Sequence, residues 1–313
     1  ARFSAPDIVK YDNKFFSIFT PGVSIFSAPF YVLGKYIGFP QLVTYLSTVL
    51  LSVVNVALII LLARKFGAGL YSALMTGVLF IFGTNAFSYA LTLTQHHLTV
   101  TLILLALLNI FRNRTLINNF WLGVIYGIGL LVDLPNGLMM FPIVVYALIK
   151  HFEFDKKADK TTITIQLKMG TMLVGLIPFL LFFGWYNHQL TGSYTKIGQT
   201  IGRSDDFQPP EIREKARLES ENPDPFGSKL PFNTRDQLHN LYILFISNER
   251  GWVFYSPVVY IGILGLFLNY KIVQKKEVVV IATAVVFSNF IIYSMFGAEG
   301  GWAFGPRYII PSA

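Results

Sequence analysis

Long apolar runs separated by short polar stretches make up most of this chain. A helix that crosses a bilayer needs roughly 17–25 mainly apolar residues. Runs of spanning or near-spanning length lie at about 42–63, 70–90, 97–111, 119–133, 136–150, 169–187, 253–269 and 278–297. The pattern therefore predicts an all-α polytopic membrane protein with about eight transmembrane helices.

Proline and glycine interrupt this pattern in two places. Pro135 and Gly137 stand between two of the apolar runs, so we expect residues 119–150 to form a broken helical hairpin. Proline and glycine also divide an apolar segment within about 20–34. That segment is typical of an interfacial or re-entrant helix, not of a crossing.

Basic residues alternate between successive connections. One set of connections holds 12 of the 25 Lys and Arg residues but only four of the 17 Asp and Glu residues, so it carries the whole net charge of +8. By the positive-inside rule this set is cytoplasmic. Residues 1–40, as a first loop, and the long segment 188–252 are then external. The excess charge faces anionic lipid, and we expect no nucleic-acid partner.

The external segment 188–252 is too long for an ordinary connection of about 4–6 residues. Residues 203–229 are charged and rich in proline, and we predict that they form a mobile flap that contacts the acceptor. A solvated loop without such a contact is the alternative. Residues 234–247 carry apolar side chains that can pack as an interfacial helix over the cavity.

Composition supports a single transmembrane domain over residues 1–313. The chain is 53% hydrophobic and 13% charged, with a mean hydropathy of +0.54, whereas soluble domains are about 25% charged. It has no cysteine, which excludes disulfides, thiolate metal sites and a cysteine nucleophile. With no phosphate-binding glycine loop and no zinc-type histidine spacing, we expect neither a metal nor a cofactor. The sequence shows no signal peptide at its start, and Tyr308-Ile309-Ile310 near its end are typical of the entry to another apolar helix. We therefore expect a piece of a longer membrane protein.

Polar residues beside the apolar runs gather on the predicted outer side. Ionisable groups there are costly to place, so each is a candidate for function. The set consists of Asp7, Asp12, Lys14, Gln95, His96, His97, Asp133, Asn136, Asn187, His188, Glu249, Arg250, Glu299 and Arg307. Within it, we interpret Asp133 as a cap for the turn before Pro135. The pattern predicts a site that faces outward.

Group transfer at an outer membrane face needs an activated donor that the membrane itself delivers. A sugar linked to a lipid phosphate meets that need. Its anionic leaving group requires Arg or Lys near the interface, and the acceptor hydroxyl requires a carboxylate that takes its proton. The outer set supplies both kinds of residue.

Several motifs resemble those of a known superfamily, and they occur in its order along nearly the whole chain. They are Tyr11-Asp12-Asn13-Lys14-Phe15-Phe16-Ser17, Thr20-Pro21-Gly22-Val23-Ser24, Ala28-Pro29-Phe30-Tyr31, Gln95-His96-His97, Tyr186-Asn187 with Thr191-Gly192-Ser193, Glu249-Arg250-Gly251-Trp252 with Tyr255-Ser256-Pro257, and residues 300–308. The pattern resembles the GT-C-superfamily polyprenyl-phosphate-dependent glycosyltransferases, such as the protein O-mannosyltransferases and the aminoarabinose transferase of lipid A.

The resemblance implies a lipid-phosphate sugar donor, an external active site and inverting transfer to an external protein, lipid or glycan. It also implies a catalytic acidic residue in the first external loop, close after a first transmembrane helix, which we expect to precede residue 1. Asp7 and Asp12 are the carboxylates present in that loop. An alternative for Asp12 is a turn with Asn13.

The remaining candidates have specific roles and alternatives. Arg307, Arg250 and Lys14 are candidates to bind the lipid phosphate; as alternatives they anchor at the interface, pair with an acid, or stay solvated. One of His96 and His97 is expected to contact acceptor or sugar; the alternative is a pair that forms hydrogen bonds at the interface. Neighbouring helix residues point about 100° apart, so the two cannot both bind one metal ion. We assign to the substrate cavity Gln95, Asn187, Glu249, Glu299 and Trp302.

Two other functions remain open. A lipid or glycan transporter also needs polar residues and broken helices within the membrane, although its charges should reach both faces. An O-antigen ligase-like or polymerase-like enzyme would also use a lipid-linked glycan and a large external loop. In each case we expect a multi-pass protein of the cell membrane.

Overall fold

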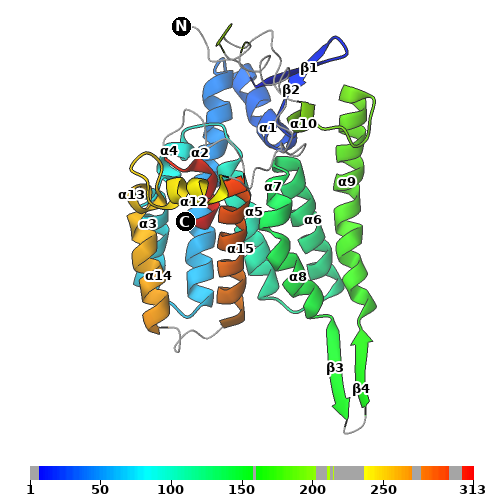
Figure 1. Cartoon of the computed structure of the whole chain (residues 1–313), viewed down its shortest axis with the longest axis vertical. Coiled ribbons are helices and arrows are strands. Elements are labelled where there is room, and N and C mark those ends of the chain that lie inside the picture. Colours follow the sequence, from blue (N-terminus) through cyan, green and yellow to red (C-terminus); the bar gives the residue numbers. More distant parts are fainter. Residues whose placement is uncertain are drawn as a thin grey trace.

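A computed structural model describes residues 7–157, 160–201, 236–269, 276–295 and 305–313, together with 210, 211 and 214. The long helices run side by side in one bundle (Figure 1). The helices in the first part of the chain are α1 (Gly22–Tyr36), α2 (Pro40–Lys65), α3 (Leu70–Phe82), α4 (Ala86–Ala90), α5 (His96–Ile110), α6 (Leu116–Val132), α7 (Pro135–Met139) and α8 (Phe141–Ile149). The later helices are α9 (Gly170–Thr191), α10 (Gly198–Ile201), α12 (Gln237–Phe245), α13 (Trp252–Tyr255), α14 (Pro257–Asn269) and α15 (Lys276–Met295). Single turns of 3-10 helix are η1 (Leu167–Met169) and η3 (Arg307–Ser312).

The helices confirm most of the pattern in the sequence. The expected break in 119–150 is present, because α6 ends at Val132 and the separate helices α7 and α8 follow. The predicted helix within 20–34 is α1. The predicted helix within 234–247 is α12. Residues 234 and 235 of the predicted range lie outside the described part of the chain. The flap expected at 203–229 lies outside the described residues, except for 210, 211 and 214.

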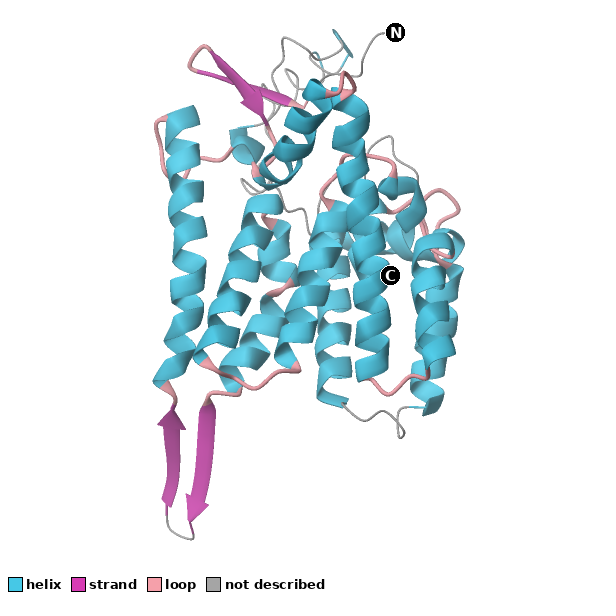
Figure 2. Cartoon of the chain, turned by 180° about the vertical axis from the view of Figure 1, so that it is seen from behind, coloured by secondary structure: helices cyan, strands magenta, loops and turns pink. Residues whose placement is uncertain are grey.

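Two antiparallel hairpins correct the purely helical expectation. Strands β1 (Ile8–Tyr11) and β2 (Lys14–Ser17) pair with Tyr11 opposite Lys14. Asp12 and Asn13 form the two-residue turn, with positive φ of 47° and 59°, as a hairpin of this length favours. The turn interpretation of Asp12 is therefore confirmed. Strands β3 (Phe152–Lys157) and β4 (Lys160–Ile165) form the second hairpin, at the opposite end of the molecule (Figure 2).

Glycine permits the closest helix packing, between α6 and α9. A Cβ on Gly123 would lie 1.9 Å from the carbonyl oxygen of Met172, and one on Gly175 would lie 2.2 Å from that of Phe120. Only a residue without a side chain fits at such distances, and small residues are the usual means by which helices in membranes approach each other. Glycine therefore sets the position of α9 against the bundle.

Basic connections meet at one end of the bundle. Lys150 at the end of α8 forms an ion pair of 2.9 Å with Glu277 at the start of α15. Lys65 at the end of α2 lies over the ring of Phe111, just after α5. These contacts bring together connections that the charge pattern had assigned to one side.

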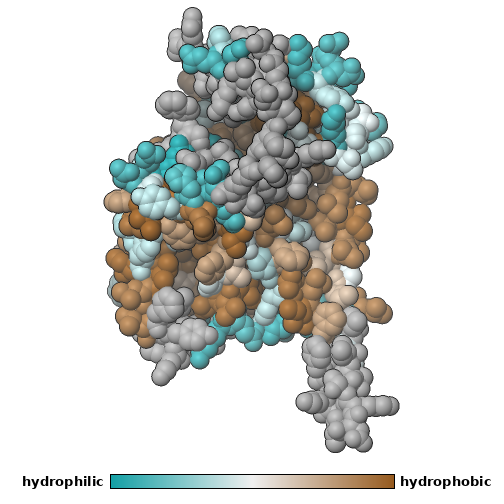
Figure 3. Space-filling view, in the orientation of Figure 1, coloured by the Kyte–Doolittle hydropathy of each residue, from teal (hydrophilic) through white to brown (hydrophobic). Residues whose placement is uncertain are grey.

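On the face seen in Figure 3, apolar side chains form a band between two more polar ends of the bundle. Pro40–Lys65 and Leu167–Thr191 are long and apolar enough to cross a membrane, and shorter apolar helices include α3, α5 and α6. The structure thus supports an apolar helical bundle, and eight crossings remain a prediction.

Candidate active site

A buried carboxylate lies where α6 gives way to α7, at the end of the bundle opposite β3 and β4. Asp133 is 7% exposed. Its Oδ2 accepts a hydrogen bond from Nε2 of Gln95 at 3.4 Å, and its Oδ1 accepts one from Nε2 of Gln199 at 3.4 Å. The hydroxyl of Tyr293 also donates to this carboxylate. Four elements therefore meet at one acidic group.

The turn that carries Asp133 is held by its neighbour Asn136. The Nδ2 of Asn136 donates to the carbonyl oxygen of Gly129 and to the hydroxyl of Thr99, both at 3.0 Å. Thr20, two residues before the first helix α1, donates to the carbonyl oxygen of Val132 at 2.9 Å. These bonds explain why a short, proline-containing turn keeps a defined place between the first loop and α5.

Burial gives Asp133 an unusual acidity. The group lies outside the helices, in the turn between α6 and α7. Removal from water raises the pKa of its carboxyl from 3.8 to about 6, while the donors from Gln199, Gln95, the backbone N–H of Leu134 and Tyr293 limit the rise. A carboxylate with a pKa near 6 is suited to take a proton near neutral pH.

An aromatic and cationic group lies beside this carboxylate. Tyr293, which contacts Asp133, stacks on Tyr308 with ring centroids 4.6 Å apart. The guanidinium carbon of Arg307 lies 4.9 Å from the ring of Tyr308, and its Nη2 donates to the Tyr308 hydroxyl at 3.0 Å. His96 packs edge-on against Tyr308, with centroids 5.5 Å apart. We call these residues, with Gln95, Asp133 and Gln199, the polar cluster.

The guanidinium of Arg307 is the cationic group of the polar cluster. Its Nε–H is buried and has no hydrogen-bond partner within the described part of the chain. Among the same residues, no carboxylate forms an ion pair with its guanidinium. A buried donor without a partner is costly to a fold, and a guanidinium is well matched to phosphate oxygens. The arrangement can accept an anion.

The two neighbouring histidines have separate surroundings. The ring of His96 lies between Tyr89 and Tyr308. The ring of His97 is fully buried in a different network, where Nε2 lies 2.9 Å from the carbonyl oxygen of Ala86 and Nδ1 accepts from Asn55 at 3.3 Å. His97 thus holds α2, α4 and α5 together. The placement of His97 gives no support to a catalytic role. His96 is the histidine that lies in the polar cluster.

The first-loop candidates lie outside the polar cluster. Asp12 is exposed at the tip of the β1–β2 hairpin, which projects above the helices (Figure 1). Lys14 is exposed and donates to the carbonyl oxygen of Gln189 at 3.2 Å. Asp7 is half-buried, and its carbonyl oxygen accepts from the backbone N–H of Ile18. The structure therefore gives the polar cluster Asp133 as its carboxylate.

Candidates from the later part of the chain have mixed outcomes. Glu249 is exposed, and its carbonyl oxygen accepts from the hydroxyl of Tyr255 at 3.0 Å. Arg250 is half-buried, with its backbone N–H on the hydroxyl of Ser247. Glu299 and Trp302 lie outside the described residues.

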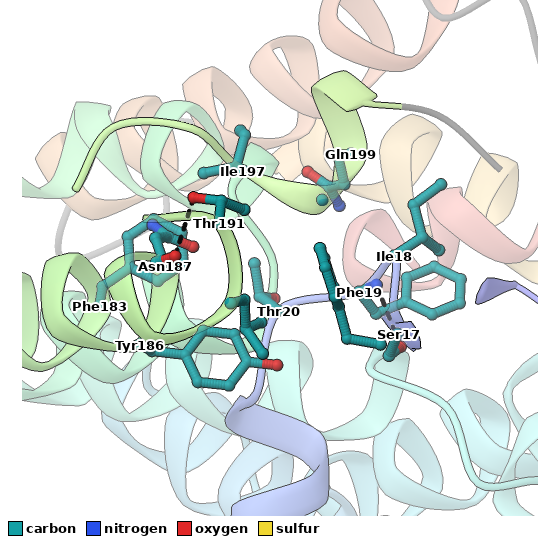
Figure 4. A pocket seen from close by; sticks show the side chains of 13 residues that line it. Ser17, Ile18, Phe19, Thr20, Phe183, Tyr186, Asn187, Thr191, Ile197 and Gln199 are labelled. Carbon is teal, nitrogen blue, oxygen red and sulfur yellow. Dashed lines mark hydrogen bonds between the residues drawn. The ribbon is translucent and has the colours of Figure 1, made fainter. Parts of the chain in front are cut away.

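Asn187 lines a pocket between the loop after β2, the end of α9 and α10 (Figure 4). Gln199 and Thr20 also line this pocket. Gln199 donates to Asp133 and Thr20 donates to the residue before it. The pocket therefore adjoins the polar cluster.

Sequence reasoning missed several members of the cluster. Asp133 belonged to the outer polar set, but we interpreted it as a turn cap, whereas its side chain accepts from Gln95 and Gln199. The signal was a carboxylate at the end of an apolar run, which is costly without a purpose. Gln199 and Tyr293 gave no signal, because an amide in a loop and a tyrosine in an apolar helix are common.

Residues 24–193, slightly more than half of the chain, match the dolichyl-phosphate-mannose-protein mannosyltransferase family. The chain belongs to this family. The resemblance in its motifs is thereby confirmed, and the protein is a membrane glycosyltransferase of the GT-C type.

The match to the mannosyltransferase family runs from the first turn of α1 to just past the end of α9 and includes His96, Asp133 and Asn187. Tyr293, Arg307 and Tyr308 lie beyond it. No curated protein and no solved structure matches the chain. The roles of the individual residues in this mannosyltransferase relative must therefore be argued from its own geometry.

Proposed function

We propose that this glycosyltransferase moves a sugar from a polyprenyl-phosphate carrier to a hydroxyl of an external protein, lipid or glycan, at the polar cluster. The observation that carries the proposal is the pairing of chemistries in the cluster. A buried carboxylate with a pKa of about 6 is linked through the stacked rings of Tyr293 and Tyr308 to the guanidinium of Arg307, whose Nε–H has no partner among the described residues. The family name supplies a lipid-phosphate donor and a protein acceptor.

The proposed reaction is a single displacement at the anomeric carbon. The acceptor oxygen attacks that carbon while the carboxylate of Asp133 takes the hydroxyl proton. The bond between the anomeric carbon and the phosphate oxygen breaks, and its electron pair leaves with the phosphate. Arg307 stabilises the negative charge that develops there. One displacement inverts the configuration at the anomeric carbon.

The other members of the cluster position these two groups. Gln95 and Gln199 orient the carboxylate of Asp133, since each donates to a different oxygen. Tyr308 supports the guanidinium through a hydrogen bond and a cation–π contact. His96, packed against Tyr308, borders the same space and is our candidate to contact sugar or acceptor.

Purified protein in proteoliposomes provides the direct test. Labelled sugar should pass to an acceptor from polyprenyl-phosphate mannose but not from a nucleotide sugar. Asp133→Asn should lose activity, whereas Asp12→Asn, at the exposed hairpin tip, should retain it. The base assignment is wrong if Asp7→Asn or Asp12→Asn abolishes transfer while Asp133→Asn leaves it intact. The function itself is wrong if no lipid-phosphate sugar serves as donor.

The outward orientation is a separate part of the proposal. The basic connections lie at the opposite end of the bundle from the polar cluster, and such connections face the cytoplasm in most membrane proteins. Family membership favours this transferase over the transporter that the sequence alone left open.

A further inference from the structure

An apolar cavity lies between α6, α8 and α9, the helices that stand directly above β3 and β4 in Figure 1. Its volume is about 280 Å³, close to the lower end of the range of roughly 300–1,000 Å³ that is typical of ligand pockets. Leu148, Met169 and Leu173 are among the side chains that line it. Among the lining residues that the structure describes, Tyr126 alone has a hydroxyl, and that hydroxyl donates to the carbonyl oxygen of Gly137 at 2.8 Å. The cavity is therefore suited to a hydrocarbon chain.

Three basic residues lie next to this cavity, at the end of the bundle that carries β3 and β4. We call Arg114, His151 and Lys168 the basic cluster. The carbonyl oxygen of the lining residue Leu148 accepts from the backbone N–H of His151 at 2.9 Å, and Lys168 directly precedes the lining residue Met169. Burial lowers the pKa of His151, and the nearby charges of Lys168 and Arg114 lower it further. The three side chains thus share one electrostatic environment.

Arg114 has a donor left over after the contacts that hold it in place. Its Nη2 donates to the backbone and side-chain oxygens of Asn109, at the end of α5, and to the carbonyl oxygen of Arg112. Such bonds are a common way to cap the last carbonyls of a helix. Its Nη1 is buried and has no hydrogen-bond partner within the described part of the chain.

The basic cluster also lacks a compensating charge. Among the side chains that the structure describes, no carboxylate forms an ion pair with Arg114 or Lys168. A water molecule can accept from one N–H group, but it does not offset the charge of two neighbouring cations. Because a poorly hydrated charge is costly unless it is paired, the cluster indicates an anion supplied from outside the chain.

The cavity and the basic cluster together select the kind of anion. A free phosphate ion satisfies the cations but leaves the cavity unfilled, and helices around a void lose van der Waals contacts. A zwitterionic lipid fills the cavity but brings a cation of its own to the cluster. An anionic phospholipid supplies both an acyl chain and an uncompensated phosphate, and basic pockets between membrane helices on the cytoplasmic side are typical sites for anionic headgroups.

The location separates this lipid from the sugar donor. We assigned the donor's phosphate to Arg307 in the polar cluster, which lies at the end of the bundle opposite β3 and β4. The basic cluster lies at the β3–β4 end, on connections that the charge pattern assigns to the cytoplasm.

We infer that the cavity and the basic cluster bind one anionic glycerophospholipid from the leaflet at the β3–β4 end. One acyl chain occupies the cavity, and the phosphate accepts hydrogen bonds from Arg114 and Lys168. The bound lipid stabilises the connections before α6, after α8 and before α9. This site goes beyond the proposed function, and its occupancy does not require transfer of a sugar.

Native mass spectrometry of the purified protein in detergent provides the direct test. The protein is titrated with phosphatidylglycerol or with phosphatidylcholine of the same acyl chains, and the bound lipids are counted. We expect one phosphatidylglycerol to bind at least tenfold more tightly than phosphatidylcholine. Inorganic phosphate should not displace it, because phosphate lacks the acyl chain.

The first variants remove the cations. Arg114→Gln and Lys168→Gln should each weaken binding of phosphatidylglycerol about tenfold, as loss of a charged hydrogen bond does. Arg112→Gln is the matched control, because it makes the same change on an exposed residue of the same connection and should leave the affinity unchanged.

Thermal unfolding in nanodiscs distinguishes lipid binding from helix capping. The unmodified protein should unfold at a higher temperature in phosphatidylglycerol than in phosphatidylcholine nanodiscs. If Arg114 binds the lipid, Arg114→Gln should remove this difference. A role only in capping α5 would instead lower the unfolding temperature equally in both lipids, which would contradict the inference.

The second set of variants fills the cavity. A Cβ on the lining residue Gly170 meets no atom within 4 Å, so Gly170→Phe has room for a ring in the space that we assign to the acyl chain. It should weaken binding of phosphatidylglycerol tenfold or more. Gly262→Phe on α14 is the matched control, since a Cβ there also meets nothing within 4 Å. If Gly170→Phe does not fold, Leu173→Trp enlarges an exposed side chain of the same lining and should act in the same direction.

Several results would overturn the inference. Equal affinity for the two lipids, or a preference that survives both Arg114→Gln and Lys168→Gln, would remove the headgroup site. Equal binding by Gly170→Phe and Gly262→Phe would remove the acyl-chain site. Displacement of phosphatidylglycerol by polyprenyl phosphate, with loss of that displacement in Arg114→Gln, would make this a donor site instead. Failure of the proposed function is a different result, namely a protein that binds phosphatidylglycerol here but transfers no sugar.

Discussion

Replacement of Asp133 by asparagine should separate catalysis from stability, because it should lower the rate of transfer and raise the unfolding temperature. Asparagine keeps the shape but cannot take a proton. Its one oxygen accepts from Gln95 or from Gln199, and the amide of the other glutamine must turn so that its oxygen accepts from the asparagine NH2. Loss of a general base lowers the rate by about 10²- to 10⁴-fold. The fall should appear in kcat, with the Kd of the lipid-linked donor nearly unchanged.

The magnitude for stability follows from the raised pKa. The folded protein holds the proton of Asp133 up to about pH 6, whereas the unfolded chain releases it near 3.8. The folded state therefore loses stability as pH rises from about 4 to 6, and the loss persists above that range. At 1.36 kcal/mol for each tenfold difference in acidity, the whole effect is up to about 3 kcal/mol. Asp133→Asn, neutral at every pH, should unfold at a higher temperature than the unmodified protein at pH 7.5.

The pH profile supplies the third measurement. With a pKa of about 6, the base is roughly one-tenth ionised at pH 5 and nine-tenths ionised at pH 7, so kcat/KM should rise about tenfold between them. Asp133→Asn should lack this rise in its residual activity. The reasoning is refuted if the variant keeps full activity, or if it is inactive yet less stable than the unmodified protein at pH 7.5.

Three other outcomes test the rest of the structure. Arg307→Ala should reduce transfer by roughly 30- to 1,000-fold, corresponding to about 2–4 kcal/mol of transition-state stabilisation; unchanged transfer from a polyprenyl-phosphate sugar would remove its phosphate role. Gly123→Ala should destabilise the protein by about 1–3 kcal/mol or prevent folding, because a Cβ would lie 1.9 Å from a carbonyl oxygen. Gly170→Ala, where a Cβ meets nothing within 4 Å, is its matched control in thermal unfolding. For topology, Asn13→Cys should react with an impermeant maleimide on intact cells, while Asn113→Cys should react only after permeabilisation; the reverse result would invert the assignment.

Local pattern determined much of this fold. Apolar runs gave the helices, because a helix that faces lipid satisfies its own backbone and needs only apolar side chains. Pro135 and Gly137 predicted the break after α6, and Asp12 with Asn13 predicted a two-residue turn. Each of these features depends on residues within a few positions of one another, so a reading along the chain is sufficient.

The β1–β2 hairpin could not be predicted from the local pattern, for a physical reason. Strand β1 is four residues long, and so is β2. So short a strand has too few positions to establish an alternating pattern, and its stability comes from its partner. The neighbouring histidines show the same limit. The sequence predicted that His96 and His97 point in different directions, but only packing decided that His97 meets Asn55 and His96 meets Tyr308.

The candidate site depends most on tertiary structure. Asp133 accepts hydrogen bonds from Gln95, Gln199 and Tyr293. These residues stand 38, 66 and 160 positions away along the chain. An isolated carboxylate after an apolar run has an ordinary pKa in water, and nothing in its neighbours along the chain says otherwise. Burial under α10 and beside α15 gives it a pKa of about 6. The sequence supplied the acid, and the fold gave it the environment in which it can act as a base.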